Sequence, residues 1–217
     1  MMTSFLSSLV AALLLVNLVA LGSSRIGTVV RAVALQGVLL GALTVAAHGG
    51  AAAGTVVALA AASALIKGWL IPKILFRALR QVAIQREVEP SLGLVPSLLL
   101  GAFTTLLAVA ASGALPFAEE RLAPLLVPAS FATIAAGFIL LTSRRKAISQ
   151  VLGYLVLENG IFIFGLLLVQ ATPFLVEAGI LLDLFVGIFV LTIIIHHINR
   201  EFSSLDTRRL SLLKDDR

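Results

Sequence analysis

Long apolar runs follow one another along most of the chain, separated by short polar or basic segments. Each run is about 18–25 residues long, the length that a helix needs to cross roughly 30 Å of hydrocarbon. Backbone groups in lipid must be satisfied internally, and these runs are too long and uniform for barrel strands. We therefore expect an all-α integral membrane protein with about seven transmembrane helices. They are expected at residues 3–21, 27–48, 51–78, 92–115, 124–142, 147–170 and 174–197.

The composition agrees with a membrane location and excludes several classes of function. Of the 217 residues, 59% are hydrophobic and 12% are charged, and the mean hydropathy is +1.09. A soluble domain is nearer to about half apolar and a quarter charged. The net charge of +5 comes from basic clusters between the apolar runs, so we expect no nucleic-acid partner. The lack of cysteine excludes iron–sulfur ligation and thiolate catalysis by this chain, and we expect no catalytic residue, cofactor or metal.

The basic residues alternate between the two sides of the expected bundle. Loops on one side hold a single basic residue, Arg121, whereas the loops on the other side and the C-terminal tail are basic. The first run also lacks a basic segment before it, which favours a first helix over a cleaved signal peptide. Since cytoplasmic loops carry the excess of Lys and Arg, we expect the N-terminus outside and the C-terminus in the cytoplasm, in the cell inner membrane. The basic residues are Arg25, Arg31, Lys73, Arg77, Arg80, Arg86, Arg144, Arg145, Lys146, Arg200, Arg208, Arg209, Lys214 and Arg217.

One polar linker, QVAIQREVEP at residues 81–90, divides the chain. It predicts an N-terminal three-helix segment at 1–80 and a cytoplasmic linker at 81–91. A four-helix segment at 92–202 and a cytoplasmic tail at 203–217 follow. No convincing internal repeat is present.

Four ionisable residues lie within the expected spans, where a charge costs several kcal/mol and usually serves a pathway or a partner. Glu158 is about 18 Å along its helix from Lys146, at about 1.5 Å per residue. On the same scale Asp183 is about 20 Å from His196, so the two acids are expected at similar depth. Lys67 and Glu177 are the other two.

Each of these residues has a structural alternative. Lys67 is either a buried functional ammonium or a side chain that snorkels to the cytoplasm. Glu177 fits an interfacial carboxylate at a helix N-terminus. Glu158 and Asp183 are either neutral structural acids or groups that take up and release protons as a neighbouring cation approaches or withdraws. Contact between Lys67 and either acid is a hypothesis at this stage.

Other polar and small residues give weaker indications. His196 is a candidate exit for a proton path, with a helix C-terminal cap as the alternative, and its neighbour His197 points about 100° away, which disfavours a shared metal. Pro72 is expected to kink or end its helix just past Lys67. Interhelical hydrogen bonds are expected of Asn17, Gln36, Thr44 and Asn159. Close helix packing is expected at Gly153, Gly160, Gly165, Gly179 and Gly187.

Residues from about Val127 to Arg200 resemble the K subunit of bacterial complex I and the C subunit of Mrp-type antiporters. The features that match are Arg144-Arg145, Gly153, Glu158-Asn159, and Asp183 followed by Gly187. With the preceding helices, the chain resembles component E of hydrogenase-4. The most specific stretch is LGYLVLENG at residues 152–160, and the Lys67–Pro72 stretch is also similar.

The resemblance has two departures. Counted from Arg144, the complex I subunit has its Glu near Leu155, one turn before Glu158. In the last helix it has Glu where this chain has Asp183, after a longer loop. The departures affect the detailed relay and leave the class unchanged.

The resemblance implies that the partners are antiporter-like membrane subunits, an H-subunit-like membrane anchor, and a peripheral redox arm with iron–sulfur and nickel–iron subunits on other chains. We therefore expect a redox-silent membrane subunit of a group 4 hydrogenase or complex I-like oxidoreductase. Glu158, Asp183 and Lys67 would take part in proton translocation. The alternatives are a structural spacer subunit and a stand-alone cation/proton transporter, and the latter would be expected to show an inverted repeat.

Overall fold

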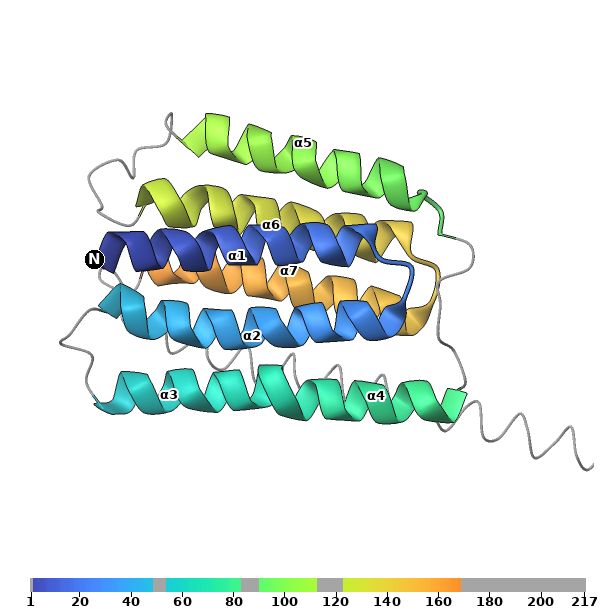
Figure 1. Cartoon of the computed structure of the whole chain (residues 1–217), viewed down its shortest axis with the longest axis horizontal. Coiled ribbons are helices and arrows are strands. Elements are labelled where there is room, and N and C mark those ends of the chain that lie inside the picture. Colours follow the sequence, from blue (N-terminus) through green and yellow to red (C-terminus); the bar gives the residue numbers. More distant parts are fainter. Residues whose placement is uncertain (1, 49–53, 83–89, 113–122, 169–217) are drawn as a thin grey trace, which may run out of the picture.

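The computed structural model describes residues 2–48, 54–82, 90–112 and 123–168, and this part of the chain is a bundle of long helices (Figure 1). The elements are α1 (Met2–Gly22), α2 (Ile26–His48), α3 (Gly54–Leu65), the π-helical turn η2 (Ile66–Leu70), α4 (Ile71–Val82), α5 (Leu94–Ser112), α6 (Ala123–Ser143) and α7 (Ala147–Leu168).

Within these residues, 6 helical segments are long and apolar enough to cross a membrane, with α3, η2 and α4 counting as one. They coincide with the first six predicted spans. The seventh predicted span, residues 174–197, lies outside the described residues.

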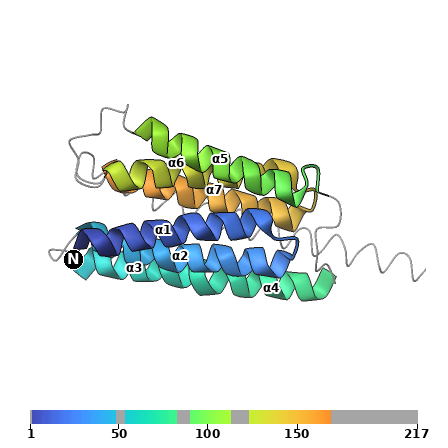
Figure 2. The ribbon, with the colours of Figure 1, turned by 45° about the horizontal axis from the view of Figure 1, so that its top comes forward.

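The helices form two layers. Figure 2 shows α5, α6 and α7 in one layer and α1, α2 and α3–α4 in the other. Between the layers, α1 packs on α5 and α6, and α2 packs on α7. The helix α5 is the most peripheral, and its outward side chains are largely exposed, for example Leu99 at 64% and Leu106 at 70%. Such an apolar outer face suits lipid or another membrane helix.

The basic connections gather at one end of the bundle. The α1–α2 connection, the end of α4 and the α6–α7 connection all lie there (Figure 1). A buried guanidinium joins the α6–α7 connection to α1 at this end: Arg144 Nη2 donates to the carbonyl of Leu21, near the end of α1, 2.8 Å away. The neighbouring Arg145 points outward and donates to Ser91 Oγ at 3.2 Å. A cation at the C-terminus of α1 also interacts favourably with that helix's dipole.

Glycines allow α6 and α7 to pack backbone against backbone. A Cβ on Gly153 would lie 2.5 Å from the Leu141 nitrogen, and one on Gly160 would lie 2.6 Å from the Ile134 nitrogen. Gly137, which the sequence analysis did not single out, faces the backbone of Leu157 in the same way. At Gly165 no described residue lies within 4 Å of the Cβ position, so close packing there stays a prediction. Gly179 and Gly187 lie outside the described residues.

This difference between glycines predicts a difference in stability. Gly137→Ala should destabilise the protein by about 1–3 kcal/mol, because the added methyl overlaps a backbone that has no room to move. The same change at Gly165, where no described residue lies within 4 Å of the Cβ position, should be neutral or slightly stabilising, since alanine is the better helix former. Unfolding midpoints of the two variants in detergent measure this. Equal midpoints would show that the close packing of α6 on α7 does not depend on a missing Cβ.

Of the two outcomes predicted for Pro72, a kink or an end of the third helix, the end is not observed. The helical segment continues through Pro72 to Val82, after the wide turn η2, in which the N–H of Ile71 bonds to the carbonyl of Ile66. In a regular α-helix the proline ring clashes with the carbonyl four residues earlier. The wider turn just before Pro72 relieves that clash. It also contains Lys67.

Candidate functional site

Lys67 lies in the interior of the bundle because η2 and α2 approach closely. A Cβ on Gly37 of α2 would lie 2.6 Å from the Lys67 Cβ, and one on Gly68 would lie 2.7 Å from Val38 Cγ2. The two missing side chains bring the backbone of η2 against α2. As a result Lys67 is 6% exposed, and its ammonium is directed across the bundle. The snorkelling alternative for Lys67 was therefore wrong.

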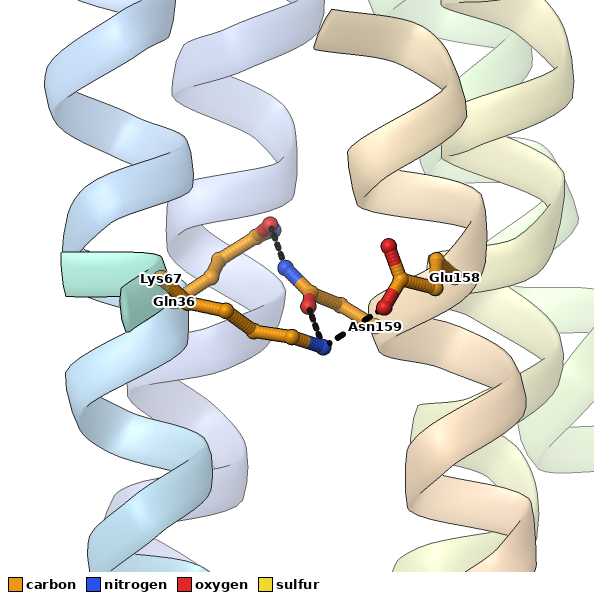
Figure 3. Close-up of polar contacts among 4 residues, drawn as sticks. All are labelled: Gln36, Lys67, Glu158 and Asn159. Carbon is orange, nitrogen blue, oxygen red and sulfur yellow. Dashed lines mark hydrogen bonds and ion pairs between the residues drawn. The ribbon is translucent and has the colours of Figure 1, made fainter. Parts of the chain in front are cut away.

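One turn of α7 supplies three partners of the Lys67 ammonium. Its Nζ lies 2.9 Å from Glu158 Oε1 and donates to Asn159 Oδ1 at 3.2 Å (Figure 3). It also lies 5.3 Å from the centroid of the Phe162 ring, within the range of a cation–π interaction. The hypothesis that Lys67 contacts one of the acids is thus confirmed for Glu158.

Glu158 is the only acidic residue in the part of the chain that the structure describes. It is 7% exposed, halfway along a membrane-length helix. Among the described residues, the charged side chain that contacts it is Lys67. A carboxylate and an ammonium in contact each favour the charged form of the other, and separating them favours the neutral forms.

A row of buried polar side chains continues from this ion pair through the bundle. Asn159 Nδ2 donates to Gln36 Oε1 at 3.2 Å, and Gln36 Nε2 donates to Asn17 Oδ1. Asn17 Nδ2 donates to Thr133 Oγ1 at 2.9 Å, and Thr133 donates to the carbonyl of Ala129. The row joins α7, α2, α1 and α6 and starts at η2. We call Asn159, Gln36, Asn17 and Thr133 the amide row.

The amide row confirms the interhelical bonds that were predicted for Asn17, Gln36 and Asn159. Thr44 donates to Leu40 of its own helix. Thr133 was not predicted as a member of this row, because a threonine in an apolar helix commonly bonds to its own backbone, as Thr133 also does. Arg144 was predicted to be a cytoplasmic loop residue, whereas the structure buries it. The sequence next to an apolar helix end does not indicate whether the side chain of a basic residue there points into the bundle or into solvent.

The remaining predicted site residues, Asp183, Glu177, His196 and His197, lie outside the described residues. Among the residues that are described, no group of three or more His, Cys, Asp or Glu side chains is placed to hold a metal ion.

Comparisons with known proteins give two kinds of relative. The chain is 32% identical over 159 residues to the uncharacterized protein Rv0085 of Mycobacterium tuberculosis, which covers 73% of this chain and 71% of that protein. It is 33% identical over 78 residues to hydrogenase-4 component E of Escherichia coli and of Shigella flexneri. That second alignment spans 36% of this chain and 36% of the hydrogenase component. No family model matches the chain, and no solved structure matches it.

Proposed function

The chain belongs to the same family as the uncharacterized protein Rv0085 of Mycobacterium tuberculosis, and we propose that it is a redox-silent membrane subunit of an energy-converting oxidoreductase complex. The complex is of the group 4 hydrogenase, formate hydrogenlyase or complex I-like type. The shorter alignment with hydrogenase-4 component E supports this assignment. The role of the chain is to contribute buried charged residues to proton translocation.

The observation that carries the proposal is the Lys67–Glu158 ion pair inside a bundle of membrane-length helices. A charge within the membrane is costly and is retained mainly where ions or protons pass. When Lys67 lies against Glu158, the carboxylate is favoured, and when Lys67 moves away, the protonated acid is favoured. A change in charge on an adjoining subunit that displaces Lys67 would therefore load Glu158 with a proton, and its return would release that proton.

The proposed proton path continues into residues outside the described part of the chain. Asp183 is the second acid of the path, and His196 is a candidate exit. A seventh helix follows at 174–197, and the C-terminus lies on the cytoplasmic side of the cell inner membrane, the N-terminus outside. The gathering of basic connections at one end of the bundle supports this orientation.

The proposed partners are antiporter-like membrane subunits, an H-subunit-like anchor, and a peripheral arm with iron–sulfur and nickel–iron subunits. Affinity purification of the tagged chain from its own membranes in a mild detergent, followed by mass spectrometry, tests this. We expect these subunits to be recovered together with the chain. Recovery of the chain alone, with substrate-dependent proton flux in liposomes, would contradict the proposal and indicate a stand-alone transporter.

A further inference from the structure

The amide row has a single direction. Each side-chain amide turns its oxygen towards Lys67 and its nitrogen away from it: Asn159 accepts from Lys67 and donates to Gln36, and Gln36 accepts from Asn159 and donates to Asn17. Asn17 then donates to Thr133, whose hydroxyl donates to the backbone of Ala129. The row begins at a cation and ends at a carbonyl.

This direction follows from the charge on Lys67. An ammonium has three donors and no acceptor, so the group facing it must be an oxygen. Once Asn159 presents its oxygen to Lys67, its nitrogen faces Gln36, which must in turn present an oxygen. The same requirement passes to Asn17. Hydrogen bonds arranged head to tail polarise one another, so the whole row strengthens the bond that Lys67 donates.

The members of the row are buried, so each amide must keep its oxygen towards Lys67 and its nitrogen away from it. Gln36 and Thr133 are 0% exposed, and Asn17 and Asn159 are 2% exposed. A buried amide that loses its partner has no water to replace it, and the loss costs about 1–3 kcal/mol. The row therefore resists reversal and keeps an oxygen acceptor facing position 67, which favours an ammonium over a neutral amine because a charged donor forms the stronger hydrogen bond.

We propose that Gln36 and Asn17 are positioning residues that, through Asn159, keep Lys67 in its charged form, so that the member of the ion pair that gains and loses a proton is Glu158. The assignment of proton exchange to this pair rests on the proposed function. The charged and polar groups that face the pair in the described part of the chain come from η2, α7, α2 and α1, and Lys67 and Glu158 are the titratable ones among them.

The protonation of Glu158 can be observed directly by infrared spectroscopy of the full-length chain, purified with the subunits that accompany it. A protonated carboxyl gives a C=O stretching band that a carboxylate lacks, and its disappearance in Glu158→Gln assigns the band. In Gln36→Met, Asn159 loses its acceptor and holds Lys67 less firmly. We expect the protonated fraction of Glu158 at a given pH to rise by about tenfold where that fraction is small in the wild type. Asn17→Leu, one link farther away, should produce a smaller rise.

Gln150→Met is the matched control, because Gln150 lies at the exposed start of α7 and donates to the Arg144 carbonyl, outside the row. It should leave the band unchanged. If Gln36→Met does not fold, Asn17→Leu decides the question. An unchanged band in the folded variants of the row would overturn the inference, as would the absence of any Glu158 band across the pH range in which the protein is folded.

The band is measured on the chain itself, so the inference and the proposed function fail separately. A stronger Glu158 band in the row variants of a chain that purifies without redox partners would uphold the positioning role and contradict the proposed assembly. An unchanged band in a chain that purifies with those partners would uphold the assembly and overturn the positioning role.

Discussion

Replacing Glu158 with glutamine is expected to abolish coupled proton translocation while the complex still assembles and its peripheral site still turns over artificial acceptors. Glutamine has nearly the shape of glutamate and keeps an oxygen that can accept from the Lys67 ammonium, which lies 2.9 Å from Glu158 Oε1. It cannot take up or release a proton between pH 5 and pH 9. The variant therefore removes the exchangeable proton and leaves the packing of α7 in place.

The measurement is acidification of inverted membrane vesicles, followed beside the turnover of the peripheral arm with an artificial acceptor. Translocation should fall to the background level, and turnover should stay within about twofold of the wild type, a difference of roughly 0.4 kcal/mol in the barrier. Tyr154→Phe is the control, since it alters a partly buried side chain one turn away on α7 and leaves the pair intact. Normal translocation by Glu158→Gln would remove Glu158 from the path. Normal translocation by a Glu158→Gln, Asp183→Asn double variant would indicate a structural spacer.

The second large effect is expected on stability, from removing one partner of the buried ion pair without the other. Glu158→Leu removes the carboxylate that lies 2.9 Å from the Lys67 ammonium and leaves that buried cation beside Asn159 and the Phe162 ring. Breaking a buried pair in this way costs about 3–5 kcal/mol. Lys67→Met leaves the carboxyl group without its cation, and it is expected to cost less because the acid can become neutral by binding a proton.

The double variant Lys67→Met, Glu158→Leu separates the two contributions. Replacing both members of a buried pair by apolar residues of similar size is often neutral or stabilising. We therefore expect the double variant to regain most of the stability that Glu158→Leu loses, as measured by denaturing-detergent unfolding of all four proteins. Additive losses in the double variant would show that the two side chains act independently and that the pair has no net coupling.

Packing glycines and polar residues differ in how far their sequence context reveals their role. Gly153 and Gly160 were predicted to be packing residues and pack closely on α6, whereas Gly165, in a similar context, has no described residue within 4 Å of its Cβ position. The helices α1, α2, α5, α6 and α7 are apolar on all sides, so no amphipathic stripe shows which face of each one is inside. Asn17, Gln36 and Asn159 were recognised as hydrogen-bonding residues because an amide in an apolar span needs a partner. Their order in the row was not recognisable, since it depends on the rotation of each helix.

The sequence by itself determined the number and limits of the six described spans, because crossing hydrocarbon requires a fixed length of apolar helix. It also determined that Lys67 and Glu158 lie away from the ends of their helices. Only the tertiary structure decided that they meet, because residues 91 positions apart are brought together by the contact of η2 with α2 and of α2 with α7. The contact of η2 with α2 depends on the absence of a Cβ at Gly37 and Gly68. The sequence pattern does not give the rotation of each helix, so it cannot show which residues these glycines face.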